Sequence, residues 1–212
     1  QIFKINTNNM KKLHLLSFLF LVALTFVSCK ESKKEEIEKT TEEKGYLVDT
    51  DNTSINWIAY KTTNKTPVKG TFTDFTIENQ PKTTNALEAL NQLKFKIPIS
   101  SLATNDTIRD GKLIKHFFGN MVNTNEITGI LHLGNNNSGT AKITMNGITQ
   151  QLQVTYQVND NLVDIEAVMD LENWKAQAAL DALNVVCFDL HKGVDGISKT
   201  WSEVTLNITT VF

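Results

Sequence analysis

The sequence has too little cysteine to depend on disulfide bonds. Its 212 residues contain two cysteines, Cys29 and Cys187. If Cys29 is modified, as argued below, Cys187 has no internal partner, and the fold must be stabilised by its hydrophobic core. Cys187 lies in the apolar segment 185–188. This setting favours a buried structural thiol over a reactive one, because burial in apolar surroundings raises the pKa of a thiol.

Motifs for metal, nucleotide and hydrolase chemistry are also absent. The histidines after residue 29 are not spaced as zinc ligands are, and there is no phosphate loop, dinucleotide fingerprint or nucleophile elbow. The net charge of −2 provides no basic surface for nucleic acid. Asp106, Asp110 and His116 are the best candidates for acid–base catalysis, but such a trio is more typical of surface polar groups. We therefore expect no enzyme, no cofactor, no metal and no nucleic-acid partner.

The N-terminal segment is typical of a secretory signal. Lys11 and Lys12 precede an apolar run, 13–27, that is shorter than the roughly 20 residues of a membrane span. The sequence 26–29, Phe-Val-Ser-Cys, resembles the lipobox of bacterial lipoproteins, in which the cysteine receives lipid and becomes the new N-terminus. An ordinary signal peptide with an incidental cysteine is the alternative. We expect residues 1–28 to be removed, with an upstream extension before Met10.

The resemblance to a lipobox implies a lipid anchor at Cys29 that holds the protein on a membrane. The expected location is the bacterial cell envelope, facing the periplasm or at the outer membrane. Residues 30–44 are mostly charged, with Ile37 as their one apolar side chain. Such a segment buries too little surface to offset the entropy lost on ordering. We expect residues 29–44 to form a lipidated, disordered tether, or alternatively a short solvated helix, before a folded domain at 45–212.

From residue 45 onward, apolar and polar side chains alternate with a period of two. This pattern predicts β-strands with one apolar and one polar face, which favours antiparallel pairing. Asn146-Gly147 predicts a tight hairpin, because both positions tolerate positive φ. The near-regular spacing of the strands indicates a sandwich or a barrel. The clearest alternating segments are 93–99, 141–145, 152–158, 163–169 and 204–208.

Two segments interrupt the strand pattern. Residues 110–119 predict a short helix that Asp110 caps and Gly119 ends in a left-handed conformation. Its apolar stripe is wide, so the helix is expected to lie across an opening or a sheet. Residues 171–183 favour a second helix by propensity.

The order and spacing of four segments resemble the YceI-like family over residues 45–212. The resemblance implies an all-β fold: an extended, antiparallel, eight-stranded, lipocalin-like barrel with one or two short helices. Characterised relatives bind isoprenoid chains or other amphiphiles inside the barrel. The four segments are 54–57 (Ser-Ile-Asn-Trp), 68–75 (Val-Lys-Gly-Thr-Phe-Thr-Asp-Phe), 109–118 with its Arg-Asp-Gly-Lys-Leu start, and 139–149.

A barrel of eight strands is wide enough to be filled by side chains or to hold one slender ligand. The resemblance favours the second: an envelope lipoprotein that binds an isoprenoid or other amphiphilic lipid for storage, transport or stress protection. Arg109 and Asp110 are candidates to meet a polar headgroup at the mouth, or else to form a local ion pair and helix cap. The predicted wall residues are Trp57, Ala59, Phe72, Phe75, Phe95, Ile97, Phe117, Phe118, Leu131, Ile143 and Val154.

A non-catalytic interaction module with a filled core is the alternative function. Trp174, Trp201 and the asparagine-rich loop 134–139 are its candidate contact surfaces. Phe72 and Phe75 differ in parity, so one of them faces outward unless a bulge intervenes. The sequence leaves a homodimer open.

Overall fold

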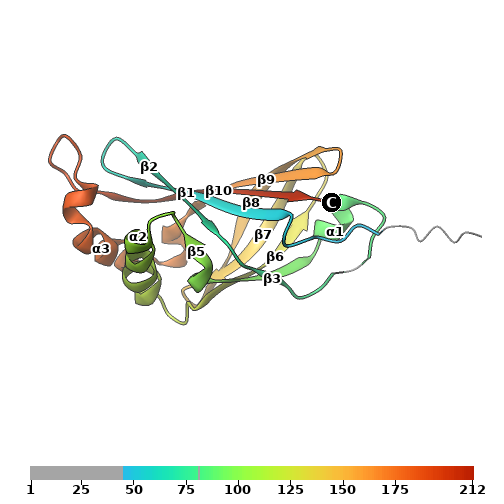
Figure 1. Ribbon diagram of the computed structural model, residues 1–212, viewed down its shortest axis with the longest axis horizontal. Helices are drawn as coiled ribbons and strands as arrows, with labels where there is room; N and C mark the ends of the chain where they lie inside the picture. The colour runs from blue at the N-terminus through green and yellow to red at the C-terminus, as the bar shows by residue number, and fades with distance from the viewer. Residues whose placement is uncertain (1–44, 81) are drawn as a thin grey trace, which may run out of the picture. The chain divides into compact units, whose positions relative to one another are not determined.

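The alternating segments pair antiparallel in one curled sheet (Figure 1). The computed structural model describes residues 45–80 and 82–212, so the signal segment, Cys29 and the tether lie outside the described residues. The order of strands across the sheet is β3-β4-β6-β7-β8-β9-β10-β1-β2-β5. Their bounds are β1 Thr53–Lys61, β2 Thr66–Phe72, β3 Thr76–Ile77, β4 Leu93–Pro98, β5 Leu102–Ala103, β6 Glu126–Leu133, β7 Ser138–Met145, β8 Ile148–Asn159, β9 Leu162–Asp170 and β10 Thr200–Val211.

The two short edge strands, β3 and β5, close the sheet on itself. β3 continues β2 after a short irregular stretch, and β5 continues β4 after one 3-10 turn. β2 pairs with β5, and β3 pairs with β4, so segment 66–77 runs antiparallel to segment 93–103. Between these two pairings the Thr73 N–H donates to the carbonyl of Ser101 at 2.9 Å. Counted as continuous strands, the ten form the eight-stranded barrel that the family resemblance implies.

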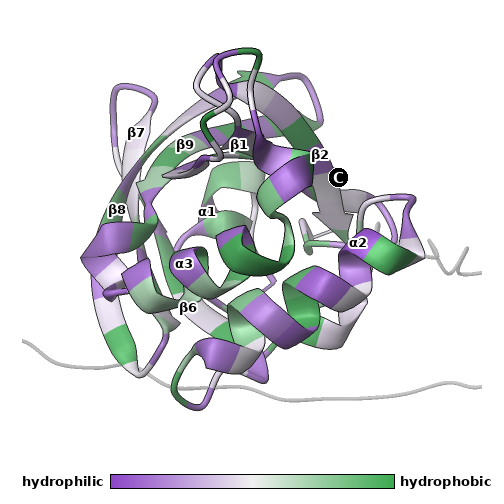
Figure 2. Ribbon diagram, turned by 90° about the vertical axis from the view of Figure 1, so that its left-hand side faces the viewer, coloured by the Kyte–Doolittle hydropathy of each residue, from purple (hydrophilic) through white to green (hydrophobic). Residues whose placement is uncertain are grey.

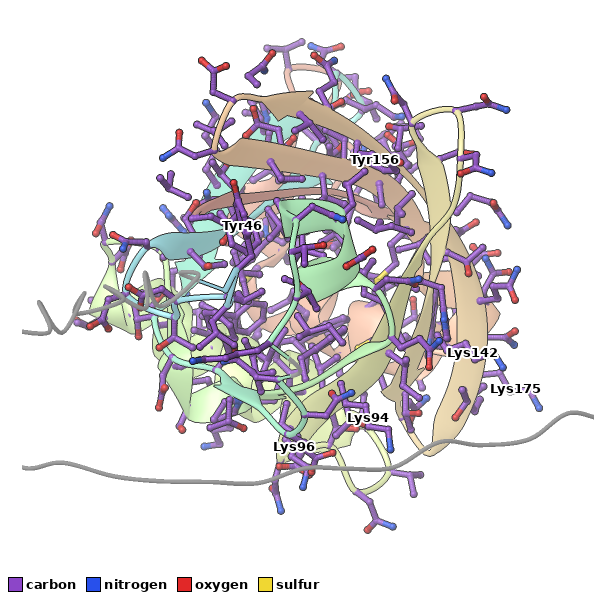
Figure 3. All side chains as sticks on the ribbon, turned by 90° about the vertical axis from the view of Figure 1, so that its right-hand side faces the viewer. Tyr46, Lys94, Lys96, Lys142, Tyr156 and Lys175 are labelled. Atoms are coloured by element: carbon purple, nitrogen blue, oxygen red, sulfur yellow. The ribbon has the colours of Figure 1, made fainter. Side chains whose placement is uncertain are left out.

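The predicted alternation places apolar side chains inside the barrel. Along β8, buried Leu152, Val154 and Tyr156 alternate with exposed polar residues. The Tyr156 hydroxyl donates to the carbonyl of Gly134 at 2.7 Å, so its polar atom is paired. Figure 3 shows Lys94 and Lys142 pointing away from the barrel. Each buried aliphatic or aromatic side chain stabilises the fold by about 1.5–3 kcal/mol relative to exposure.

The predicted helix at 110–119 starts earlier than expected. Helix α2, Thr107–Lys112, is capped by Asp106, whose Oδ1 accepts from the N–H groups of Ile108 and Arg109 at 3.1 and 3.0 Å. The assignment of Asp110 as the cap was wrong, because the Asp110 N–H already bonds to the carbonyl of Asp106 inside the helix. The chain continues through a π-helical turn, Leu113–Phe117, and a 3-10 turn, Phe118–Asn120. Gly119 lies within that last turn and has no left-handed φ.

The second predicted helix is divided in two. A 3-10 turn, Leu171–Trp174, ends at Lys175 with a left-handed φ of 52°, and helix α3, Gln177–Val186, follows. Helices α2 and α3 lie across one end of the barrel (Figures 1 and 2). Within the described chain, no helix is long and apolar enough to cross a membrane.

A third helix, α1 (Ala86–Leu90), lies toward the other end of the barrel (Figure 1). The sequence analysis did not predict it, because it contains five residues. Its cap, Asn85, accepts from the N–H of Glu88 at 2.9 Å. Its own residues Ala86, Ala89 and Leu90 are buried.

Candidate functional site

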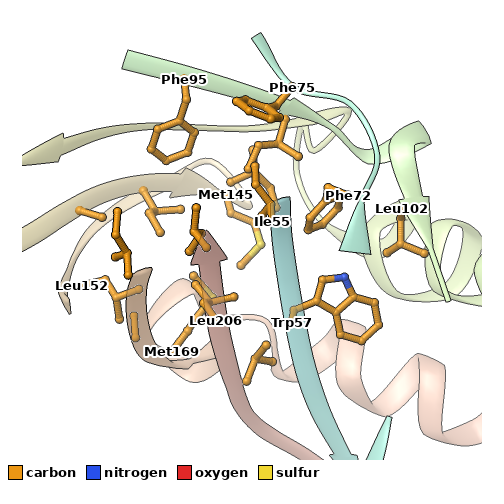
Figure 4. Close-up of a pocket in the computed structure, with 18 of the residues that line it drawn as sticks. Ile55, Trp57, Phe72, Phe75, Phe95, Leu102, Met145, Leu152, Met169 and Leu206 are labelled. Carbon is orange, nitrogen blue, oxygen red and sulfur yellow. The ribbon is translucent and has the colours of Figure 1, made fainter. Parts of the chain in front are cut away.

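An apolar cavity of about 220 Å³ lies inside the barrel (Figure 4). Thr53, Ile55, Trp57 and Ala59 line it from β1 alone. Because a strand rises about 3.3 Å per residue, these positions span about 20 Å. Leu90 of α1 contributes to the lining at one end, and α3 contributes Leu180 and Leu183 at the other. The interior is therefore elongated and hollow rather than filled by side chains.

All eleven predicted wall residues line this cavity. Contact between these side chains and a ligand stays a prediction. The residues come from β1, β2, the stretch after β2, β4, the helical segment after α2, β6, β7 and β8. They are Trp57, Ala59, Phe72, Phe75, Phe95, Ile97, Phe117, Phe118, Leu131, Ile143 and Val154.

Phe72 and Phe75 both face the cavity despite their opposite parity (Figure 4). The sequence analysis required a bulge for both rings to face inward, and the structure has an irregular stretch, 73–75, between β2 and β3. The pairing register with segment 93–103 shifts across that stretch. The loss of strict alternation turns Phe75 back toward the interior.

Several lining residues were missed by the sequence analysis. Strands β9 and β10 and helix α3 supply much of the wall, and the alternation of 163–169 and 204–208 was the available signal. Nothing in that alternation distinguished a cavity wall from ordinary core. The missed residues include Ile165, Ala167, Met169, Leu180, Leu206 and Ile208.

Arg109 and Asp110 do not belong to the cavity lining. Arg109 Nη2 lies 3.4 Å from Asp106 Oδ2, and Asp110 Oδ1 accepts from the N–H and hydroxyl of Thr104 at 2.9 and 2.6 Å. The Arg109 N–H, followed by smaller contributions from its charge and from the Ile108 N–H, lowers the pKa of Asp106. Both predicted headgroup residues thus make local contacts at the start of α2, and their contact with a headgroup stays a prediction.

Two glycines let aromatic rings lie along the inner wall. Trp57 pairs with Gly70 across β1 and β2, and Phe95 pairs with Gly129 across β4 and β6. A Cβ atom at Gly70 would lie 2.5 Å from Cε2 of Trp57, and one at Gly129 would lie 2.9 Å from Cε1 of Phe95. Real Cβ atoms do not approach so closely, so each ring occupies the space that a side chain on the neighbouring strand would fill.

Trp174 and Cys187 are parts of the core. Trp174 is 1% exposed and donates from Nε1 to the carbonyl of Ile143 at 3.0 Å. The suggestion that Trp174 forms a contact surface was wrong, because its ring is buried beside β7. Cys187 is buried as predicted, and burial raises the pKa of its thiol.

His191 is the most strongly shifted titratable group beside the helix-covered end of the cavity. Its Nδ1 lies 2.7 Å from Oγ1 of Thr200, a cavity-lining residue. Burial, and then the positive charges of Lys61 and Lys112, lower the pKa of His191 to about 4. Between pH 6.5 and about pH 4 the imidazole of His191 is therefore mostly neutral in the folded protein, whereas the same imidazole is mostly protonated in the unfolded chain.

We expect the free energy of unfolding to fall as the pH decreases from about 6.5 to about 4. In this window the unfolded state binds the proton of His191 and the folded state does not, so acid favours unfolding. His191 accounts for about 1–3 kcal/mol of this loss in the free energy of unfolding. This is less than its full pKa shift implies, because the ring is only partly buried. Urea unfolding of wild type and His191→Gln at pH 7 and pH 4.5 measures it. Equal pH dependence in the two proteins would contradict this assignment.

Comparison with known proteins identifies the domain. A family model described as a YceI-like domain matches residues 46–212. A search of curated proteins found no match. The solved structure of a polyisoprenoid binding domain from Saccharophagus degradans, implicated in plant cell wall breakdown, is similar with a TM-score of 0.53 and 12% identity over 79% of this chain and 99% of that one. BcnA from Burkholderia cenocepacia is similar with a TM-score of 0.51 and 15% identity over 78% of this chain and 99% of that one.

At these identities, the two structural likenesses establish the fold alone. They cover nearly the whole of each relative, so the barrel of this chain corresponds to the complete relative domain. The family match extends over most of the sequence and includes every strand of the barrel. The chain therefore belongs to the YceI-like family.

Proposed function

We propose that the protein binds one apolar or amphiphilic lipid chain inside its barrel. The observation that carries the proposal is the elongated cavity of about 220 Å³, whose lining is almost entirely apolar. One enclosed water needs about 10–15 Å³ of such space, so the cavity has room for on the order of fifteen chain atoms. Each buried methylene contributes about 0.8 kcal/mol, so fifteen contribute about 12 kcal/mol before the cost of association.

An isoprenoid is the favoured chemical class. The structural relative from Saccharophagus degradans is described as a polyisoprenoid binding domain. The wall of the present cavity is rich in Phe, Leu, Ile and Met side chains, which suit a branched hydrocarbon chain. Storage, transport or protection under stress are the roles that a barrel enclosing such a chain can serve.

The open apolar interior supports a binding role over an interaction module and over an enzyme. An interaction module with a filled core does not require an open apolar interior. Catalysis requires polar groups that converge in the pocket, often with shifted pKa values, whereas the cavity lining contains no Asp, Glu, Lys or Arg. In the part of the chain that the structure describes, no cluster of three His, Cys, Asp or Glu side chains is placed to hold a metal ion.

We predict that organic extraction of protein purified from its native envelope will release about one lipid chain per barrel. The physical reason is that a lipid chain inside the apolar cavity is removed from water, which favours the filled barrel over the empty one. Mass spectrometry of the intact protein and of the extract gives the identity and the stoichiometry. Extracts without lipid, together with no uptake of apolar probes by the stripped protein, would reject the carrier function.

A lipid anchor at Cys29 is the second part of the proposal, and it places the barrel at the membrane of the cell envelope. It is supported by the basic, apolar and small-residue pattern of residues 11–29. We predict that Cys29→Ser yields protein in the soluble fraction, because the change removes the thiol that would carry the lipid, and the apolar run 13–27 is shorter than the roughly 20 residues of a membrane span. Fractionation measures the change, and Ser28→Ala is the neighbouring control that should remain anchored. A Cys29→Ser protein that still carries N-terminal acyl groups would refute the lipobox interpretation.

A further inference from the structure

The indole nitrogen of Trp57 lacks a hydrogen-bond partner. Among the described residues, Trp57 Nε1 is the one buried side-chain nitrogen or oxygen for which the structure provides none. The other two tryptophans differ: Trp174 donates to the carbonyl of Ile143 at 3.0 Å, and Trp201 donates to the carbonyl of Thr62 at 2.7 Å. Trp57 is 7% exposed and lines the cavity. The part of the chain that the structure describes thus leaves one buried side-chain donor unpaired, and this donor lies in the wall of the proposed binding site.

No neighbouring side chain is able to accept this hydrogen bond. The pairing register places eight residues around Trp57 on the inner face of β1, β2 and β10, and all eight are apolar. In Figure 4 the nitrogen edge of the ring is turned toward Phe72 and Leu102, which are also apolar. The eight residues are Ile55, Ala59, Val68, Gly70, Phe72, Val204, Leu206 and Ile208.

An ordered water is a poor substitute for a protein partner at this position. An enclosed water is held by two to four hydrogen bonds to polar groups. The inner-face neighbours of Trp57 supply no polar side chain, and the backbone groups of β1 are engaged with β2 and β10. A buried N–H without a partner loses the hydrogen bond that it makes to water in the unfolded chain. The acceptor that removes this cost must arrive with the ligand.

We propose that Trp57 Nε1 donates a hydrogen bond to an uncharged carbonyl oxygen of the bound chain. The inference rests on the proposed function and specifies its ligand as a prenyl or other apolar chain that carries an ester, amide or ketone carbonyl, rather than as a pure hydrocarbon. A carboxylate is disfavoured, because one N–H does not offset the desolvation of a charge in an apolar cavity. Trp57 is the middle residue of β1, and Ile55 and Ala59 line the cavity on either side of it. The carbonyl therefore joins two apolar segments.

The test compares pentadecane with its mid-chain ketone, diheptyl ketone. Each ligand displaces the neutral fluorescent probe phenyl-naphthylamine from the stripped protein, and the displacement gives its affinity. We expect the ketone-to-alkane affinity ratio to be about tenfold higher in wild type than in Trp57→Phe, which keeps an aromatic ring and lacks the donor. Phe95→Leu is the matched control, since it trims the same cavity wall without removing a donor. Its affinities for both ligands should fall by the same factor, so that their ratio equals that of wild type.

The indole N–H resonances of wild type provide a second readout that does not depend on a variant. Adding the ketone should shift the Trp57 resonance downfield and leave those of Trp174 and Trp201 in place, whereas pentadecane should produce no such downfield shift. Equal ratios in wild type and Trp57→Phe, or an unmoved Trp57 resonance with bound ketone, would overturn the inference and leave the carrier function standing. Failure of both ligands to displace the probe would overturn both.

Discussion

Phe95→Arg will abolish binding of an apolar chain and lower the free energy of unfolding by about 3–5 kcal/mol. The Phe95 ring lines the cavity and lies against Gly129 of the neighbouring strand. Its inner-face neighbours, Ile97 and Ile127, are apolar. No acidic residue belongs to the lining, so a guanidinium at this position has no carboxylate to pair with. The charge and its remaining water would also occupy the space of the ligand.

Two variants separate the effect of the charge from other causes. Phe95→Leu removes the ring and keeps the wall apolar, so it should retain binding and lose only part of the stability. Gln153→Arg adds the same charge on the exposed outer face of β8 and should change neither property by more than about 0.5 kcal/mol. Unfolding is followed in urea, and binding is followed with an apolar fluorescent probe. Folded Phe95→Arg that binds the probe with wild-type affinity would show that the wall is assigned incorrectly.

The inner face of the barrel could be predicted from the sequence because alternation is a local property. Residues such as Ile143 and Val154 have polar neighbours on both sides, and a strand turns successive side chains to opposite faces. The pattern does not depend on which strand lies beside which. For this reason the predicted wall residues on strands lie on the cavity although the partners of those strands were unknown. Phe117 and Phe118, which lie in helical turns, do not follow from this alternation.

The irregular positions were harder to predict, since they depend on competition between nearby candidates. Asp106 and Asp110 are both plausible helix caps, and the choice is settled by which backbone N–H groups are left free at the start of α2. Phe75 reaches the cavity only because the strand loses its register after Phe72. The five-residue α1 is too short for a helical period to be recognised.

The role of Gly70 could not be inferred from the sequence alone, because it depends on which strands pair. A glycine between Lys69 and Thr71 in a strand indicates a bulge or a close approach without saying what approaches. The register between β1 and β2 places it opposite Trp57, and that pairing identifies the indole as the approaching group. The same holds for Gly129 and Phe95. Residues distant in sequence therefore determine whether a ring lies along the wall or crosses the cavity.

Gly70→Ala will lower the free energy of unfolding by about 1–3 kcal/mol, the usual range for overpacking a well-packed core. The added Cβ would lie 2.5 Å from Cε2 and 2.8 Å from Cη2 of Trp57. The rigid indole cannot yield locally, so it must rotate away from β2 and into the cavity. The displaced ring takes space from the ligand, and we expect the affinity for an apolar chain to fall at the same time. Urea unfolding and probe titration measure the two effects.

Gly111→Ala is the control for the loss of a glycine as such. Gly111 lies in helix α2, and a Cβ there meets nothing within 4 Å. This change should stabilise the protein by about 0.5–1 kcal/mol, because alanine is the better helix former. Trp57→Leu combined with Gly70→Ala should remove the clash, so that adding Gly70→Ala to Trp57→Leu costs little stability. If Gly70→Ala destabilises the Trp57→Leu protein as much as wild type, the cost does not arise from the indole, and the glycine serves some other purpose in the strand.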